Sequence, residues 1–244
     1  MKNKIRVFPE YFKTLLPAIQ TAAVRAGGDA YLVGGCVRDM LLGIQHADTD
    51  ITFIGDGLQF AHYLHHLLNG KLTFHRQFQT ATLNLESGLK IDIATARSEI
   101  YPASGSLPVV SVGTLSQDLF RRDFTINAMA VSLNKKDLGS LIDEYGGEHD
   151  LAKGLIRVLH EKSFIDDATR MLRAIRFSQR FHFHIERETK KLLQQARVCG
   201  VLNRMQPQRV RDEFILCLEE QNPPGVLKQI EALVGFDFFD SKIR

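Results

Sequence analysis

A glycine pair and a nearby arginine form the first candidate site in the sequence, within GGCVRDMLLG over 34–43. Gly34 and Gly35 follow a short apolar run, and glycines at such a turn let backbone N–H groups face a bound phosphate. A helix that begins at this turn adds its positive end. Arg38 lies one turn into that helix, where its guanidinium can reach the same anion. The segment therefore predicts a cradle for phosphate groups.

A pair of aspartates, Asp48 and Asp50, stands at the start of a β-branched run that predicts a strand. The strand period of two puts both carboxylates on one face, where they repel each other unless a cation lies between them. Mg²⁺ prefers oxygen ligands and suits this pair together with a substrate phosphate. Asp92, in the alternating run 90–93, is a candidate third carboxylate. A phosphate cradle beside such a site is typical of phosphoryl or nucleotidyl transfer. The alternatives are a D-x-D in a surface loop and an ordinary exposed strand residue at Asp92.

The elements that must position these residues follow from hydrophobic periodicity and turn signals. Helices are predicted over 9–27, 37–42 and 58–69, and strands over 31–33, 50–54, 80–85, 89–95 and 141–143. Residues 128–133 predict a strand or a buried helix end, and the Pro-, Gly- and Ser-rich segment 101–113 predicts a loop. From 164 to about 217 the periodicity is helical, with breaks near 182–184 and at Pro207, and a short helix follows Pro223 and Pro224. We expect an α+β head over 1–145 and a helical unit over 146–244.

The composition excludes several classes of protein. Hydrophobic residues make up 44% and charged residues 24% of the 244 residues, which is typical of a globular protein of one or two domains and not of a disordered or fibrous one. No apolar run approaches the roughly 20 residues that cross a bilayer. The N-terminal sequence has no apolar core of a secretion signal, and the three scattered cysteines indicate reduced thiols. We expect a cytoplasmic protein that does not contact a membrane.

Charge is unevenly distributed along the chain, although the net charge is only +3. Residues 170–211 hold 11 basic side chains against two acidic ones, Glu186 and Glu188. Such a stretch indicates either a solvated helical surface or a face that binds a polyanion.

Four motifs in order carry a resemblance to a known family. GGCVRDMLLG with DTD resembles the first motif of the class II tRNA nucleotidyltransferase and bacterial poly(A) polymerase family, which belongs to the DNA polymerase β-like nucleotidyltransferase superfamily. RRDFTINAMA (121–130), DEYGGEHDLAKGLIR (143–157) and FIDDATRMLRAIRF (164–177) resemble the second, third and fourth motifs, and 186–193 and 208–218 resemble the helical region that follows. The resemblance implies a nucleotidyltransferase head with a mixed sheet flanked by helices, followed by an all-α neck.

The resemblance implies attack of an RNA 3′-hydroxyl on the α-phosphate of a nucleoside triphosphate, with release of pyrophosphate. Asp48 and Asp50 would hold two Mg²⁺ ions, with Asp92 as a third catalytic carboxylate. Gly34, Gly35 and Arg38 would hold the triphosphate. In the second motif, Arg122 and Asp123 would hold the sugar and phosphate of the incoming nucleotide. The third motif would be a hinge-like loop between head and neck.

The fourth motif places Asp167, Arg170, Arg173 and Arg176 at intervals of three, which predicts one ridge of a helix. Asp167 accepts hydrogen bonds and Arg170 donates them, so the pair can read the amino group and adjacent acceptor that C and A share. In the family these positions read the base, which implies ATP and CTP as substrates, and Arg173 and Arg176 would face the triphosphate. The alternative is an Asp167–Arg170 ion pair on a surface helix.

The sequence departs from the family pattern in its fourth motif, in the helical region that follows, where Gln208 replaces the usual Glu, and in its length. Asp166 and Ala168 stand where the fourth motif usually has Glu and Pro. The chain also stops soon after the neck, whereas the family continues into domains that grip tRNA, so a partner protein is one source of the missing RNA anchor. The expected function is addition of C and A, or of A alone, to tRNA 3′ ends. The alternatives are poly(A) synthesis on other RNA 3′ ends and a non-catalytic RNA-binding module.

Overall fold

The computed structural model describes residue 5 and residues 8–44, 48–102 and 108–240, apart from the side chains of Asp48, Phe239 and Asp240. The chain forms two compact units. The head unit consists of Met1–Ser98, Val110–Arg122 and Ile126–Gly147, and the helical unit consists of Glu99–Val109, Asp123–Thr125 and Glu148–Arg244. The expected α+β fold is therefore confirmed, although two short segments within the predicted head cluster with the helical unit.

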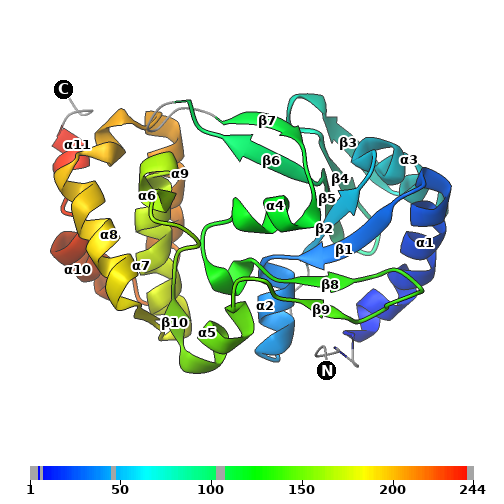
Figure 1. Ribbon diagram of the computed structural model, residues 1–244, viewed down its shortest axis with the longest axis horizontal. Helices are drawn as coiled ribbons and strands as arrows, with labels where there is room; N and C mark the ends of the chain where they lie inside the picture. The colour runs from blue at the N-terminus through cyan, green and yellow to red at the C-terminus, as the bar shows by residue number, and fades with distance from the viewer. Residues whose placement is uncertain (1–4, 6–7, 45–47, 103–107, 241–244) are drawn as a thin grey trace. The chain divides into compact units, whose positions relative to one another are not determined.

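A seven-stranded mixed sheet forms the centre of the head unit, in the order β3-β4-β5-β2-β1-β8-β9 (Figure 1). β2 and β5 pair in parallel, and the other neighbouring pairs are antiparallel. The predicted 80–95 hairpin is present as β4 and β5. The strands are β1 Asp29–Val33, β2 Asp48–Ile54, β3 Lys71–His75, β4 Thr80–Asn84, β5 Lys90–Thr95, β8 Ala130–Ser132 and β9 Leu141–Ile142.

Four helices belong to the head unit: α1 Glu10–Ala26, α2 Gly35–Leu41, α3 Gly57–Leu68 and α4 Leu115–Phe120. The first three match predicted helices. α1 buries Phe12 and Ile19 and ends at Gly27, whose φ of 68° is in the left-handed region that glycine adopts without strain. α3 packs on the sheet through Phe60, whose ring stacks on Phe53 with a centroid distance of 4.5 Å.

The prediction that 101–113 is a loop is wrong at the end of the segment. Val109–Val112 forms β7, which pairs with β6 Arg97–Ile100. Residues 103–107 of that prediction lie outside the described part of the chain. The β-branched valines extend the backbone despite the surrounding Pro, Gly and Ser. α4 was not predicted, although Thr114 and Gln117 form a capping box at its start.

The helical unit is built around α7 Thr169–Phe181, which packs against α9 Pro207–Leu218 and α10 Pro223–Leu233. Pro207 and Pro223 begin these helices, since proline is compatible with the first helical turn. The third motif contains a helix, α5, and is not entirely the predicted loop. The remaining elements are α5 Gly147–Lys153, α6 Ser163–Asp166, α8 Arg187–Val198 and α11 Asp237–Asp240, the parallel pair β10 Leu155–Ile156 and β11 His184–Ile185, and the 3₁₀ turns Arg76–Phe78, Thr125–Asn127 and Val201–Arg204.

Cys36, Cys199 and Cys217 are all free thiols. None of the helices in the described part of the chain has the length and hydropathy that crossing a lipid bilayer requires.

Candidate functional site

Two of the three predicted catalytic aspartates are neighbours across the sheet. Asp50 in β2 and Asp92 in β5 are register partners on parallel strands. Register partners on adjacent strands lie on the same face of a sheet. Asp48 is two residues earlier in β2, with Lys90 as its register partner, and its side chain lies outside the described part. The sheet therefore places Asp92 beside Asp50.

The two described carboxylates are held by short polar contacts. Thr82 Oγ1 donates to Asp92 Oδ1 over 2.7 Å, and Lys90 Nζ lies 2.6 Å from Asp92 Oδ2. The Asp50 backbone N–H donates to Cys36 Sγ over 3.2 Å, and the thiol lies 3.8 Å from Asp50 Oδ2. Burial and then the charge of Asp50 raise the pKa of Cys36 to about 12, so the thiol keeps its proton and can donate it. Cys36 lies in α2, and it thus connects the helix after the glycine turn to Asp50.

The donor set on this face fits a hard divalent cation. Carboxylate oxygens from neighbouring strands are ligands of the kind Mg²⁺ prefers. Within the described residues, no cluster of three or more His, Cys, Asp or Glu side chains has a metal-binding arrangement. Asp50 and Asp92 are the two carboxylate ligands that the described residues offer to a cation on this face. A third carboxylate would come from Asp48.

The glycine turn between β1 and α2 is adjacent to two guanidinium groups. Gly34 has a φ of 73° and a ψ of −134°, a conformation open to glycine and strained for other residues. A Cβ at Gly34 would lie 2.7 Å from Arg122 Nη1, and one at Gly35 would lie 3.3 Å from Arg38 Nη2. Because glycine has no Cβ, the turn leaves room for the guanidinium groups of both arginines beside it.

Arg38 is buried, with 5% of its surface exposed. Its Nε donates to Asp39 Oδ1 over 2.8 Å and its Nη1 donates to Asn127 Oδ1 over 2.6 Å. A buried guanidinium requires such partners, because an unpaired charge in the interior is costly. These bonds tie α2 to the second motif, and the contact of Arg38 with a triphosphate stays a prediction.

Asp118, which was not predicted as a site residue, organises the arginines of the second motif. Its carboxylate is fully buried and accepts bonds from Arg122 Nη2 at 3.0 Å, Arg121 Nη2 at 2.8 Å and Thr52 Oγ1 at 3.2 Å. Burial alone would raise the pKa of Asp118, but Arg122 and Arg121 hold it below its usual value. The i,i+3 and i,i+4 spacing of Asp118 from the two arginines was the available signal in the sequence.

Arg122 keeps donors directed away from Asp118. Its Nε is buried and has no hydrogen-bond partner among the described residues, and its Nη1 lies beside Gly34. The Nη1 group is therefore the Arg122 donor that lies closest to the glycine turn, where an oxygen of a bound phosphate could accept from it. This arrangement favours the predicted contact of Arg122 with a nucleotide phosphate.

In the helical unit, Asp167 is not on the predicted helical ridge, which corrects the expected geometry of the fourth motif. Its backbone is extended, with a φ of −138° and a ψ of 98°, and α7 begins at Thr169. Asp167 Oδ1 instead accepts the backbone N–H of Thr169 over 3.1 Å, a local side-chain-to-backbone bond that aspartates form in turns. Asp167 Oδ2 accepts a hydrogen bond from Arg209 Nη2 over 2.8 Å, so the arginine that contacts this carboxylate comes from α9.

Arg170 lies in the first turn of α7 and is buried. Its Nη1 donates to Ser163 Oγ over 2.7 Å. Ser163 and Arg209 were not predicted as site residues, and each contacts one member of the predicted base-reading pair. They hold Arg170 and Asp167 from outside the motif's helix, and no local spacing connects Asp167 with Arg209.

Arg173 and Arg176 are engaged by carboxylates. Arg173 Nη2 lies 2.7 Å from Asp123 Oδ2, and Arg176 Nε lies 2.6 Å from Glu213 Oε1. The contacts continue as a chain of alternating charges through Asp123, Arg173, Glu213, Arg176, Glu220 and Arg180. Arg176 is 5% exposed. The structure thus brings Asp123 and Arg173 together, whereas the triphosphate contacts of Arg173 and Arg176 stay predictions.

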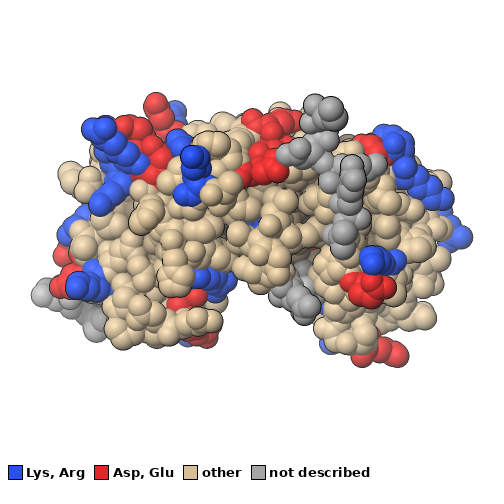
Figure 2. Space-filling model, turned by 90° about the horizontal axis from the view of Figure 1, so that it is seen from below, with Lys and Arg blue, Asp and Glu red and all other residues tan. Residues whose placement is uncertain are grey.

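The same ion pairs change the meaning of the basic stretch 170–211. Arg173, Arg176, Arg180 and Arg209 are paired with acidic residues from outside that stretch. On the face in Figure 2, Lys and Arg side chains lie among Asp and Glu side chains. Part of the positive charge of 170–211 is therefore neutralised by ion pairs within the protein and does not form an RNA-binding surface.

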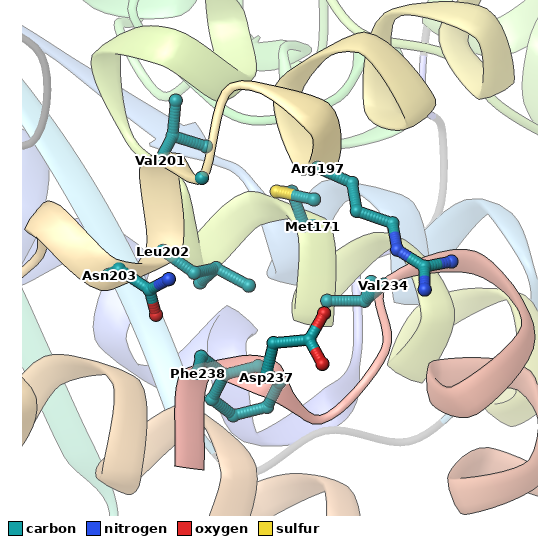
Figure 3. A pocket seen from close by; sticks show the side chains of 9 residues that line it. Met171, Arg197, Val201, Leu202, Asn203, Val234, Asp237 and Phe238 are labelled. Atoms are coloured by element: carbon teal, nitrogen blue, oxygen red, sulfur yellow. The ribbon is translucent and has the colours of Figure 1, made fainter. Parts of the chain in front are cut away.

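A small pocket of about 60 Å³ lies in the helical unit (Figure 3), and none of the predicted site residues of the fourth motif lines it, although Met171 directly follows Arg170. Met171, Leu202 and Phe238 contribute apolar side chains, and Arg197 and Asp237 contribute opposite charges. Pockets that bind small-molecule ligands usually have volumes of about 300–1,000 Å³, so this pocket is too small for a nucleotide.

Comparison with known proteins identifies the family. Residues 30–157 match the family model described as the poly A polymerase head domain. An A-adding tRNA nucleotidyltransferase of Halalkalibacterium halodurans is 40% identical over 93% of this chain and 55% of its own length. A CC-adding tRNA nucleotidyltransferase of Deinococcus radiodurans is 41% identical over 66% of this chain and 43% of its own length. The structure of the Thermotoga maritima CCA-adding enzyme complexed with tRNA aligns with a TM-score of 0.84 and 45% identity, over 97% of this chain and 54% of that one.

The chain thus spans about half the length of these relatives. The family match covers the glycine turn, both described carboxylates and the second motif, and the structural likeness extends through the helical unit. On these grounds the chain belongs to the class II tRNA nucleotidyltransferase family, of which it represents the head and neck.

Proposed function

We propose that this chain adds CMP and AMP, or AMP only, to tRNA 3′ ends and releases pyrophosphate. The observation that carries the proposal is the position of Asp50. It is paired in register with Asp92 and contacted by Cys36 from the helix that follows the glycine turn. A carboxylate face and a phosphate cradle are thereby joined within one unit.

Asp48, Asp50 and Asp92 are the residues that would hold Mg²⁺. When bound, divalent cations polarise phosphoryl oxygens and assist ionisation of an attacking hydroxyl. The chain itself supplies the remaining contacts. The Gly34 and Gly35 turn and Arg122 Nη1 bind the triphosphate of ATP or CTP, and Arg38 braces α2 through its bond to Asn127.

Asp123 and Arg173 form a second group, which would bind the sugar and phosphate of the incoming nucleotide. Phe124 N–H donates to Asp123 Oδ1 over 2.8 Å, and Arg173 occupies the other carboxylate oxygen. The carboxylate is thereby oriented before a nucleotide arrives. Such preorganisation reduces the entropy lost on binding.

Base selection is the proposed role of Asp167 and Arg170. Replacing Arg170 with Ala is expected to lower the discrimination of CTP and ATP against UTP and GTP by about ten- to a hundredfold, since a base-edge acceptor would lose its partner at a cost of about 1–3 kcal/mol. Ser163→Ala should shift selection in the same direction by less, because it removes one hydrogen bond that orients the Arg170 guanidinium and leaves the guanidinium in place. The measurement is kcat/KM for each nucleoside triphosphate.

Arg180→Ala is the matched control for base selection. Arg180 is on the same helix and pairs with Glu220, and its side chain is 43% exposed. We expect the selectivity ratio of this variant to equal that of the unmodified chain. Unchanged selectivity in Arg170→Ala would refute the base-reading role, whatever its total activity.

The product is distinguished by the RNA substrate. The chain is incubated with tRNA lacking CCA, tRNA ending in CC and an unstructured RNA, each with labelled CTP or ATP and Mg²⁺. Addition of C and then A to the first tRNA shows a CCA-adding enzyme, and addition to the second alone shows an A-adding one. Extension of the unstructured RNA shows a poly(A) polymerase. No incorporation into any of them contradicts the enzymatic proposal and favours an RNA-binding module.

How RNA is anchored is a separate proposal, because the relatives are about twice as long as this chain. We infer that a further protein segment or a partner protein supplies contacts to tRNA beyond the acceptor end. Addition to a short acceptor-stem RNA should then be as efficient as addition to full tRNA. A strong preference for full tRNA by this chain alone would contradict that inference.

A further inference from the structure

Two histidines on the outer face of α3 lie unusually close together. His62 and His66 are exposed and separated by one helical turn. Their Nε2 atoms are 3.1 Å apart. The rings meet at 88° with centroids 4.5 Å apart, which is less than rings that met tip to tip would show. The two Nε2 atoms therefore lie within hydrogen-bond distance of each other, with the rings nearly perpendicular.

The helix that carries this pair is firmly fixed to the head unit. Phe60, Ala61 and Leu64 are fully buried on the opposite face of α3. Asp56 caps its start by accepting the N–H groups of Leu58 and Gln59, each over 3.0 Å. The backbone spacing of the two histidines is thus set by the core, so little reorganisation is required to bring a ligand between them.

The separation of the two nitrogens matches the bite of one metal ion. Zinc–nitrogen bonds of about 2.0–2.1 Å at a tetrahedral angle place two ligand nitrogens about 3.3 Å apart. Neutral imidazole suits Cu²⁺, Ni²⁺ and Zn²⁺, and histidines at i and i+4 of a helix present one face to such an ion. We propose that His62 and His66 form a surface site for one divalent transition-metal ion.

The proposed site differs from the carboxylate face in its ligand chemistry. It offers nitrogen and no carboxylate, so it does not favour Mg²⁺. His65, the third histidine of α3, is directed elsewhere, with its Nε2 3.1 Å from the Gly70 carbonyl oxygen. No third His, Cys, Asp or Glu ligand joins the pair in the described part of the chain, so water completes the coordination. The alternative is a hydrogen bond between two neutral rings.

The test is calorimetric titration of the tag-free full chain with Ni²⁺ and with Cu²⁺, in a Cys199→Ser background because Cys199 is an exposed thiol. We expect a phase of one equivalent, tighter for Cu²⁺ than for Ni²⁺, that a large excess of Mg²⁺ does not displace. His62→Ala and His66→Ala should each abolish this phase, whereas His65→Ala should retain it. At one equivalent of Cu²⁺, electron paramagnetic resonance should show nitrogen ligation that the first two variants lose.

Retention of the one-equivalent phase in both His62→Ala and His66→Ala overturns the proposal, as does the absence of any such phase in the parent chain. Circular dichroism establishes that each variant is folded, which is expected because both side chains are exposed. Binding in the Asp50→Asn variant should be unchanged. The result is therefore independent of whether the chain transfers nucleotides.

Discussion

Asp50→Asn is expected to lower the rate of nucleotide addition by about a thousandfold or more, since carboxylate-held metal ions contribute several kcal/mol of transition-state stabilisation and each 1.4 kcal/mol is about tenfold in rate. The substitution keeps the side-chain shape, and the backbone N–H that donates to Cys36 is retained. The charge alone is removed from the face that Asp50 shares with Asp92. Single-turnover incorporation of labelled ATP at saturating Mg²⁺ measures the effect.

Asp29→Asn is the matched control for this prediction. Asp29 is in β1 of the same sheet, and its register partner is Ile54, at the end of β2 remote from Asp50. It forms an exposed pair with Lys136 at 3.1 Å. We expect the rate of nucleotide addition by this variant to stay within about twofold of the parent rate, because surface substitutions of this kind usually change free energies by no more than about 0.5 kcal/mol. A rate for Asp50→Asn within tenfold of the parent would exclude this sheet face as the catalytic one.

The head of the molecule was largely predictable because its signals are local. Alternation along 90–93 places Asp92 on one face of a strand, and the glycine pair marks the turn before α2. The parallel pairing of β2 with β5, which puts Asp92 beside Asp50, joins strands that are separated by α3, β3 and β4. Strand order of this kind depends on packing of the whole sheet and not on the period of any one strand.

The charged residues of the helical unit were less predictable, because their partners are remote in sequence. Arg173 binds Asp123, 50 positions away, and Asp167 binds Arg209, 42 positions away. Counting charges within 170–211 could not detect these pairs, so it overstated the basic surface. The interval of three from Asp167 to Arg170 likewise suggested one helix, although Asp167 lies in the extended turn between α6 and α7.

Asp118→Asn is expected to lower the free energy of unfolding by about 3–5 kcal/mol, the usual effect of removing one partner from a buried ion pair. The carboxylate is fully buried, and Arg121 and Arg122 both depend on it. Arg122 would also lose its position beside Gly34, so nucleotide addition should fall even below the unfolding temperature. Urea denaturation followed by circular dichroism gives the stability change, and the Asp29→Asn control should lose less than about 1 kcal/mol.

The pH dependence of stability separates the charge of Asp118 from its shape. Burial opposes ionisation of Asp118, but the neighbouring Arg122 and Arg121 keep its pKa below the unfolded value of about 3.9. A lowered folded-state pKa contributes stability that is present above the unfolded pKa and is lost as the pH falls through the folded one. The stability gap between the parent chain and Asp118→Asn should therefore be constant from pH 7 to about pH 5 and shrink below about pH 4. A gap that persists unchanged into strong acid would show that packing, and not the ion pairs with the second motif, is what Asp118 supplies.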